Sequence, residues 1–318
     1  MPSPDSQRIV AVVVTFNRLD LLQGLVAALT QEPKLTSVVV VDNASTDGTG
    51  AWLAERAAVS SGVPVDVVLL SDNTGGAGGF KAGMERAVEL AADLVWLMDD
   101  DGLPEPGCLD LLLEYRDRLD FWGPVVVDRA DPERLVFPIR LPGGARTVRR
   151  LPDVAAAART SGDPGILEDV VIPFNGVLVT ADLIGRIGTV RADYFIWGDD
   201  HEYRLRAEKS GARIATVVGA KVLHPTVGEL GTPMAFGKTT YNHSPSDLKH
   251  YCMARNNLLN LRDYNGWPHA LAFVAKTVWF YTFTRPDPAR LRLSFQAMRA
   301  GLRGDFTGHR RFLGGGGS

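Results

Sequence analysis

The sequence predicts an α/β protein with a mostly parallel central sheet, helices on the faces of that sheet, and a C-terminal helical extension. Four short and nearly continuous apolar runs in the first hundred residues predict strands that are covered on both faces, at 9–14, 37–41, 65–70 and 94–97. Helical patterns lie between these runs, and strands alternating with helices imply right-handed crossovers and a parallel sheet. With 318 residues, 45% of them hydrophobic, the chain can bury a full core.

The charge and the cysteine content exclude several classes of function. A net charge of −3 gives no reason to expect the basic face of a nucleic-acid-binding protein. Cys108 and Cys252 are too few for a disulfide framework, which fits a reducing compartment. Neither a signal-peptide pattern nor an apolar run of membrane-spanning length is present in the sequence, so we expect the bulk of the chain in the cytoplasm.

The middle of the chain gives weaker signals. Proline and glycine are frequent from about 120 to 172, which predicts excursions and loops. Strand-like runs follow at 177–180 and 213–218, and a helix is expected to begin near Asp200. Residues 228–246 have the composition of a loop.

The C-terminal region is helical and aromatic. The run 270–283, ALAFVAKTVWFYTF, predicts an apolar helix interrupted only by Lys276 and too short to span a bilayer. Seven arginines and two aspartates follow in residues 285–311, and an apolar helix with a cationic flank predicts a peripheral membrane anchor. Packing of this helix on the core is an equally supported alternative. Residues 314–318, GGGGS, have the composition of a flexible linker and are left out of functional reasoning.

Polar residues follow four of the predicted strands. They are Thr15-Phe16-Asn17, Asp42-Asn43, Asp72-Asn73 and Asp99-Asp100-Asp101. In open α/β sheets ligands bind outside the carboxyl ends of the strands. The sequence therefore predicts a ligand site where these four segments converge.

A glycine-rich segment, NTGGAGGF at 73–80, leads into a predicted helix. Glycines let backbone approach a ligand closely, and a helix N-terminus favours anions, so the segment predicts a cradle for a phosphate or a sugar. A tight strand-to-helix turn is the structural alternative. The segment matches neither the dinucleotide fingerprint nor a P-loop, and no glycine fingerprint follows the first strand, so an oxidoreductase is not expected.

Three adjacent aspartates end the fourth apolar run, in WLMDDDG. Asp99 and Asp101 can face one side of a strand end and share a hard divalent cation, while Asp100 points elsewhere. A nucleotide diphosphate would complete the coordination of such a cation. The alternative is a solvated acidic turn. A lone histidine, His224 in VLHP, would be a metal ligand only in partnership with these aspartates.

A second acidic group opens the helix predicted near Asp200. In YFIWGDDHEYRLR, Asp199, Asp200 and Glu202 crowd within four residues. Such crowding raises carboxylate pKa values, as a general base requires. Stabilisation of a helix N-terminus by these carboxylates is the structural alternative.

In their order, these motifs resemble the inverting nucleotide-sugar glycosyltransferases of family two, which have the GT-A fold, a Rossmann-like α/β architecture. The motifs that carry the resemblance run from residue 12 to residue 225 and are VVVTFNR, VVVDNASTDGT, NTGGAGGF, WLMDDDG, FNG, WGDDHEYRLR and LHP. Together with YCMARNN and TRPDP, they are most similar to the bacterial galactofuranosyltransferases that initiate mycobacterial-type cell-wall galactan.

The resemblance implies a role for each candidate residue. Those implied to bind the donor are Asp42 and Asn43 at the nucleotide, Thr15 and Asn17 near the base and ribose, and Asn73, Gly75, Gly76 and Asp99 along the donor. Those implied to hold Mn²⁺ or Mg²⁺ are Asp99, Asp101 and His224. Asp200 is implied to be the general base, and Asp199 to orient the acceptor or support its neighbour. Many family members have Glu-Asp at the Asp199-Asp200 position.

The resemblance also implies domains, partners and location. Residues 1–235 would form the donor-binding and catalytic domain, and 236–313 a helical region that associates with the membrane. The donor would be UDP-galactofuranose and the acceptor a polyprenyl-diphosphate-linked rhamnosyl-GlcNAc. The enzyme would be peripheral on the inner face of the plasma membrane. The resemblance is also compatible with a homo-oligomer. The alternatives are transfer of another sugar, such as rhamnose, and a non-catalytic scaffold that binds sugar nucleotides or lipids.

Overall fold

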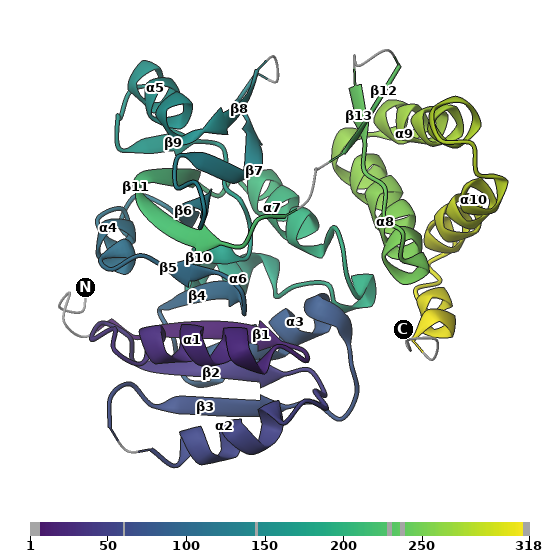
Figure 1. The fold of residues 1–318 in the computed structure, drawn as a ribbon. Helices are drawn as coiled ribbons and strands as arrows, with labels where there is room; N and C mark the ends of the chain where they lie inside the picture. Colours follow the sequence, from purple (N-terminus) through teal and green to yellow (C-terminus); the bar gives the residue numbers. More distant parts are fainter. Residues whose placement is uncertain (1–6, 60, 144–145, 228–230, 236–238, 314–318) are drawn as a thin grey trace. The chain divides into compact units, whose positions relative to one another are not determined.

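The structure is a computed structural model, which describes residues 7–59, 61–143, 146–227, 231–235 and 239–313. The predicted linker at 314–318 and parts of the predicted loop at 228–246 lie outside the described residues. The chain forms two compact units (Figure 1). The sheet unit comprises residues 1–192 and 206–227, and the helical unit comprises residues 193–205 and 228–318.

The first half of the central sheet is parallel. Its four strands are β1 (Ile9–Thr15), β2 (Ser37–Asp42), β3 (Val65–Leu69) and β4 (Leu94–Asp99), and they lie in the order β3-β2-β1-β4. They confirm the four predicted strands. All residues of β1 and β2 are buried, because helices cover both faces of a parallel sheet.

The second half of the sheet is mixed. Beyond β4 lie β10 (Asn175–Thr180), β6 (Phe121–Asp128), β11 (Ile214–His224) and β5 (Leu103–Pro104). Strand β10 is antiparallel to both β4 and β6, whereas β6 and β11 are parallel. Strands β7 (Arg134–Arg140), β8 (Thr147–Arg150) and β9 (Ile166–Glu168) extend this side.

The prediction of loops from 120 to 172 was wrong, because β6, β7, β8 and β9 lie in that range, and the eight residues of β6 are all buried. Gly123 and Pro124 suggested a loop, but each has a place in the sheet. A side chain at Gly123 would come within 2.6 Å of Val177. Pro124, which lacks an N–H group, lies where the register between β6 and β11 shifts.

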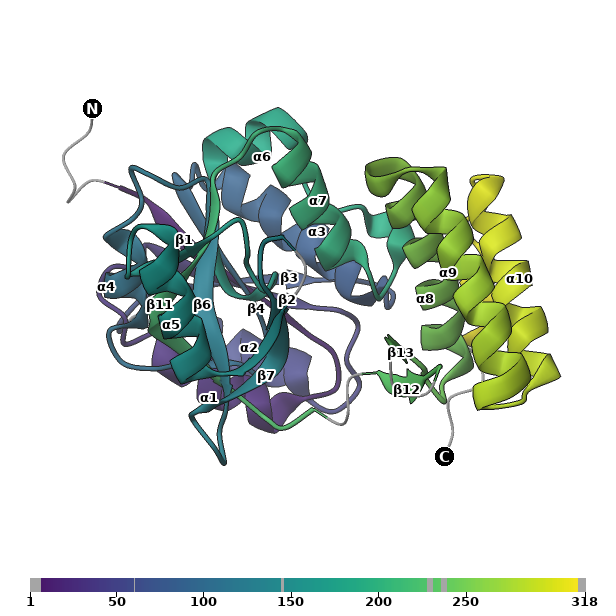
Figure 2. The same cartoon turned by 90° about the horizontal axis from the view of Figure 1, so that it is seen from above.

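Helices cover both faces of the sheet, as the view in Figure 2 shows for α2 and α3. The core on one face joins alternate residues of β1 to α1 (Leu19–Leu29), α2 (Thr49–Ala57) and α4 (Cys108–Leu113). Helix α3 (Gly75–Glu89) packs on the opposite face of β1. The sheet unit also contains α5 (Leu151–Ser161) and α6 (Ala181–Ile187), whereas α7 (Asp199–Lys209) begins in the helical unit and ends in the sheet unit.

In its described residues, the helical unit contains three longer helices and a short pair of antiparallel strands (Figure 1). They are α8 (Asp247–Asn260), α9 (Trp267–Trp279), α10 (Pro288–Leu302), and the strands β12 (Thr232–Met234) and β13 (Thr239–Tyr241). A π-helical turn, Phe280–Thr284, continues α9, and together they confirm the predicted apolar helix. Within the described ranges, no helix combines the length and the apolar character that crossing a bilayer would require.

Candidate functional site

The carboxyl ends of the parallel strands meet at one edge of the sheet unit. Thr15 pairs with Asp42 across β1 and β2, and Val14 pairs with Asp99 across β1 and β4. Asn17, in the loop after β1, accepts a hydrogen bond at 2.7 Å from the backbone N–H of Thr46, in the loop after β2. Predicted site residues of three strands therefore lie at the same edge, as the parallel arrangement requires.

The glycine-rich loop is held to β2 by Asn43. The buried Asn43 donates from Nδ2 to the Gly75 carbonyl at 2.9 Å and to Asn73 Oδ1 at 3.2 Å. Its Oδ1 accepts from the backbone N–H of Thr74 at 2.9 Å and from the Thr74 hydroxyl at 3.0 Å. Asn73 Oδ1 also accepts from the N–H of Gly75 at 2.8 Å. The Asn43 amide is thus fully used within the loop and determines its shape.

The glycines of the loop differ in their surroundings. A side chain at Gly79 would come within 2.4 Å of Val14, so glycine is needed there for α3 to pack on β1. A side chain at Gly76 would meet no atom within 4 Å. Packing therefore explains Gly79, in agreement with the structural alternative. It does not explain Gly76, which leaves open backbone at the N-terminus of α3.

An arginine that the sequence did not indicate neutralises two of the three aspartates. Arg18 Nη1 lies 3.1 Å from Asp100 Oδ1 and 2.7 Å from Asp101 Oδ2. The buried Thr15 hydroxyl donates to Asp100 Oδ2 at 2.7 Å. Burial raises the pKa of Asp100, although Thr15 and Arg18 act in the opposite direction. Asp100 thus ties the end of β4 to β1, and the Thr15 hydroxyl is used in that contact.

Asp101, which follows β4, and His224, at the end of β11, lie close together. His224 Nε2 lies 3.1 Å from Asp101 Oδ1, yet within the described residues this oxygen has no well-aligned hydrogen bond. Burial alone would raise the pKa of Asp101, but His224 and Arg18 outweigh it and lower this pKa. Burial would likewise lower the pKa of His224, and Asp101 outweighs it, so that pKa is raised.

This pair has the chemistry of two metal ligands. His224 Nδ1 lies 2.7 Å from the Pro225 carbonyl, so this nitrogen carries the proton and neutral His224 turns the lone pair of Nε2 toward Asp101. A divalent cation would take the place of the proton that Asp101 otherwise favours on Nε2. Across the described ranges, no three histidine, cysteine or acidic side chains are arranged to hold a metal ion. The ligand role of Asp99 therefore stays a prediction.

In the helical unit, a strained loop carries the second acidic group. Phe195, Trp197 and Gly198 all have positive φ, at 66°, 69° and 86°. Asn256 Nδ2 donates to the carbonyls of Tyr194, Ile196 and Trp197 at 3.1, 3.2 and 2.7 Å, and Asn260 Nδ2 donates to that of Gly198 at 2.9 Å. Such backbone persists only where its surroundings determine it, as at functional sites. Sequence reasoning missed both asparagines.

Arg255, in the ARNN motif, supports the same loop. It is fully buried, and its guanidinium donates to the carbonyls of Tyr194 at 2.8 Å and Phe306 at 3.1 Å. Its burial excludes the contact with an anionic lipid or an acceptor diphosphate that a polyprenyl-linked acceptor suggests for this arginine. Asn256 and Asn260 lie on the same helix as Arg255. Helix α8 therefore supports the acidic loop, which consists of residues 195–198 and the two aspartates that follow them.

Asp199 and Asp200 begin α7 directly after this loop. Burial and the charge of Asp200 raise the pKa of Asp199 to about 8. Burial also raises the pKa of Asp200, against the hydrogen bond that Asp200 accepts from the N–H of His201 at 2.6 Å. Asp200 is the more accessible of the two. Near neutral pH the buried Asp199 is therefore expected to hold a proton.

Asp199→Asn is expected to reduce the loss of folding stability that occurs as the pH rises from about 4 to about 8. An unfolded aspartate titrates near about 4, and folded Asp199 near about 8. The folded state holds a proton that the unfolded state has released, so stability falls as pH rises through this window. Asparagine cannot ionise, so the melting temperature of the variant should exceed that of the wild type by a margin that widens across the window.

The matched control is Asp182→Asn at an exposed position. Its melting-temperature difference from the wild type should show no such widening. A difference for Asp199→Asn that stays constant between about pH 4 and about pH 8 would contradict the raised pKa of Asp199.

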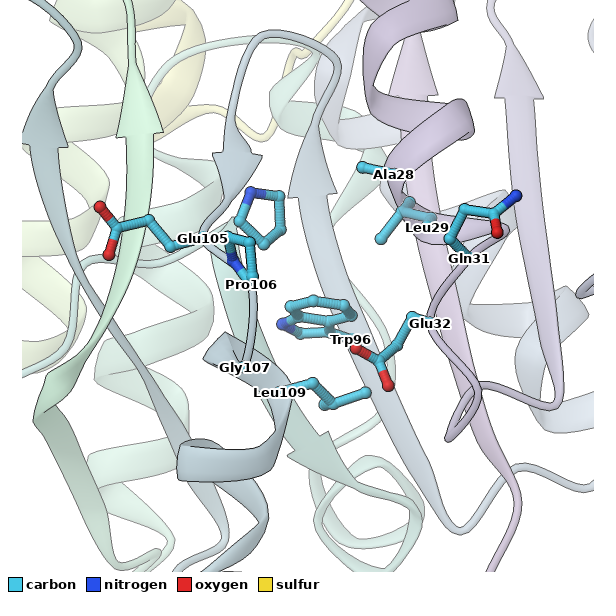
Figure 3. A pocket seen from close by; sticks show the side chains of 10 residues that line it. Ala28, Leu29, Gln31, Glu32, Trp96, Glu105, Pro106, Gly107 and Leu109 are labelled. Atoms are coloured by element: carbon cyan, nitrogen blue, oxygen red, sulfur yellow. The ribbon is translucent and has the colours of Figure 1, made fainter.

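A pocket of about 330 Å³ lies elsewhere on the sheet unit (Figure 3). It is lined by the end of α1 from Ala28, by Trp96 of β4 and by the segment 104–109. The Trp96 indole N–H already donates to the Gly176 carbonyl at 2.8 Å. None of the predicted site residues lines this pocket, so it is separate from the edge of the sheet described above.

Comparison with known proteins gives matches along most of the chain. The family model described as Glycosyl transferase family 2 matches residues 10–153. Galactofuranosyltransferase GlfT1 of Mycolicibacterium smegmatis is 31% identical over 302 residues, which cover 93% of this chain and 97% of that protein. Galactofuranosyltransferase GlfT1 of Mycobacterium tuberculosis H37Rv is 32% identical over 311 residues, which cover 95% and 97%.

Solved structures show the same architecture. GalNAc-T7, solved with UDP, GalNAc and Mn²⁺, matches with a TM-score of 0.60 and 13% identity, over 98% of this chain and 59% of that one. At this identity the likeness concerns the fold alone.

Proposed function

Because the chain belongs to glycosyl transferase family 2 and is a glycosyltransferase of the predicted GT-A fold, we propose that it transfers galactofuranose from UDP-galactofuranose to a polyprenyl-diphosphate-linked rhamnosyl-GlcNAc. The family and the enzyme class that the motifs predicted are thereby confirmed. The observation that carries the proposal is the similarity to the mycobacterial galactofuranosyltransferases over nearly the whole of both chains. Since it covers 95% of this chain, the similarity includes the helical unit as well.

In the proposed reaction, Asp200 takes the proton of an acceptor hydroxyl while that oxygen attacks the anomeric carbon of the donor. The new glycosidic bond forms on the face opposite the diphosphate, the bond to UDP breaks, and the anomeric centre inverts. The buried Asp199 keeps its proton near neutral pH, which supports Asp200 as the base. Asp199 then supports its neighbour.

The donor is proposed to bind at the edge of the sheet unit. Asn17 and Asp42 would face the nucleotide, and Asn43 and Asn73 would shape the glycine loop beside it. The open backbone at Gly76 supports a close approach of the donor there. Gly75 begins α3, where the N-terminal amides favour a phosphate.

Asp101 and His224 are proposed to hold Mn²⁺ or Mg²⁺, with Asp99 as the predicted third ligand. A bound ion would stabilise the negative charge on the departing UDP, an effect worth several kcal/mol. The unaligned Asp101 oxygen beside His224 supports this assignment. The Mn²⁺ and UDP present in the GalNAc-T7 structure support it by analogy of fold.

The helical unit is proposed to bind the surface of an anionic membrane. Trp267, Leu271, Trp279 and Phe283 are exposed on α9 and its π-helical turn, by 53%, 61%, 43% and 67%. The exposed positions of residues 267–283 include no Asp, Glu, Lys or Arg. The exposed Arg285 follows directly, so an apolar face with a cationic flank matches an anionic lipid surface.

Phe283→Ser is expected to weaken binding to vesicles that contain phosphatidylglycerol by roughly tenfold to a hundredfold. Removing a buried phenylalanine from a lipid interface forfeits about 1.5–3 kcal/mol. Co-sedimentation with the vesicles measures the change. Leu69→Ser is the matched control, because Leu69 is 61% exposed but lies on β3 of the sheet unit. Equal losses for both variants, or none for Phe283→Ser, would contradict the proposed membrane face.

The donor is tested by incubating the purified protein with a lipid-linked rhamnosyl-GlcNAc and either UDP-galactofuranose or dTDP-rhamnose. A product that forms with UDP-galactofuranose alone is the expected result. Transfer from dTDP-rhamnose alone would replace the proposal with a rhamnosyltransferase. Binding of a UDP-sugar without turnover of any donor would indicate a non-catalytic scaffold.

A further inference from the structure

A second pocket, of about 230 Å³, lies within the helical unit. It is lined by Thr240, Tyr241, Asn242, Asn257, Phe273 and Lys276. The lining contains two amides, two hydroxyls and one ammonium group, and no acidic residue. Such a set of donors around one positive charge is suited to an anion with several oxygen atoms.

Lys276 is the feature of this pocket that needs an explanation. It is the one charged residue in the apolar run 270–283. Across the described ranges, no carboxylate pairs with its ammonium group and no hydrogen-bond acceptor contacts it. Burial lowers the pKa of Lys276, and no neighbouring negative charge offsets that effect. A partly buried and unpaired ammonium group is costly, and a bound anion would offset this cost.

The pocket adjoins the acidic loop of the same unit. Asn257, which lines the pocket, has its Oδ1 3.8 Å from the position of a side chain at Gly198. Gly198 directly precedes Asp199 and Asp200, so one asparagine connects the Lys276 pocket to the proposed base. An anion in this pocket would therefore be near the acceptor whose hydroxyl Asp200 activates.

The same helix connects the pocket to the proposed membrane face. Lys276 and Phe273 line the pocket from α9, while Leu271 and Trp279 of that helix are exposed. In a lipid-linked acceptor, the diphosphate stands between the apolar chain and the sugars. A pocket for phosphate next to an apolar helix face reproduces this order of groups.

We propose that the Lys276 pocket binds the diphosphate that joins the acceptor's sugars to its lipid. This inference rests on the proposed function, because it assumes a lipid-linked acceptor. Lys276 would bind one of the phosphates by charge, and Asn242 and Asn257 would donate hydrogen bonds to its oxygens. The pocket would position the acceptor without taking part in the chemistry.

The inference is tested with two acceptors that carry the same disaccharide, one on a short polyprenyl diphosphate and one on a neutral alkyl chain of equal length. Lys276→Met is expected to raise the KM of the diphosphate acceptor by about tenfold or more. Its kcat, and the KM of the neutral acceptor and of UDP-galactofuranose, should stay within about twofold of wild type. Lys276→Arg should keep most of the preference, and Lys249→Met, at an exposed position on α8, should keep all of it.

Two results would overturn the inference. The first is an equal rise in KM for both acceptors with Lys276→Met, because the lysine would then act through packing. The second is that Lys276→Met loses binding to phosphatidylglycerol vesicles while its KM for the diphosphate acceptor is unchanged. The pocket would then hold a phospholipid phosphate.

A direct binding measurement separates this inference from the proposed function. Geranyl diphosphate, titrated into the full chain by calorimetry, needs no donor and no transfer. The wild type is expected to bind it at least tenfold more tightly than Lys276→Met does. Equal binding by the two proteins would overturn the inference even if transfer is observed. A difference in binding would support it even if the sugar donor proves to be another one.

Discussion

Replacing Asp200 with asparagine is expected to lower the transfer rate by about 10²–10⁴-fold while the affinity for UDP-galactofuranose stays within about twofold of wild type. Asparagine keeps the size of the side chain but cannot accept the proton of the acceptor hydroxyl. Asp200 belongs to the helical unit, whereas the proposed donor site lies on the sheet unit, so donor binding should be spared. Single-turnover transfer gives the rate, and calorimetry with UDP-galactofuranose, without acceptor, gives the affinity.

Asp199→Asn is the neighbouring control for this experiment. Asp199 is buried and holds its proton near neutral pH, so a neutral asparagine resembles its working state. The loss of transfer should therefore be much smaller than for Asp200→Asn. The opposite order, with an active Asp200→Asn and an inactive Asp199→Asn, would exchange the roles of the two carboxylates.

Replacing Asp101 with asparagine is expected to weaken the binding of UDP in the presence of Mn²⁺ by about 10–100-fold or more. The variant should also lose most of the response to a chelator, because the proposed ion is what connects Asp101 and His224 to the diphosphate. Calorimetric titration of UDP, with Mn²⁺ and with EDTA, measures both effects. If a chelator leaves the affinity of the wild type unchanged and Asp101→Asn binds UDP normally, the metal assignment is wrong.

Arg18→Gln is the matched control for Asp101→Asn. Arg18 contacts Oδ2 of Asp101, whereas His224 contacts Oδ1. Removal of Arg18 therefore breaks its ion pairs with Asp100 and Asp101 and leaves the Asp101–His224 contact in place. We expect a lower melting temperature but an intact response to the chelator. A lost response in Arg18→Gln would mean that Asp101 acts through its position and not as a ligand.

The parallel half of the fold could be predicted from the sequence because its signals are local. Strands β1, β2 and β4 are uninterrupted apolar runs that any parallel sheet would bury. Strand β6 could not be predicted in this way, because Gly123 and Pro124 disfavour a strand when only their own segment is considered. Their suitability depends on Val177 and on the register of β11, which are more than fifty residues away.

The candidate site shows the same division. Asp101 and His224 were predicted to meet, and they do, although they are separated by more than a hundred residues. That prediction came from the resemblance to a family, since a lone histidine has no local signal for a partner. Arg18 was missed because a loop arginine looks like any exposed charge until the fold brings the aspartates to it.

The sequence by itself determined the parallel strands, the acidic and glycine-rich segments at their ends, and the apolar helix with its arginine flank, because each is written in consecutive residues. Only the tertiary structure decided what these segments contact. It assigned residues 193–205 to the helical unit and used Arg255, Asn256 and Asn260 to hold the acidic loop. It also placed Lys276 in a pocket beside that loop, with no ionic partner among the residues that the structure describes. Pairing and burial depend on residues that are distant in the chain, so no local pattern can specify them.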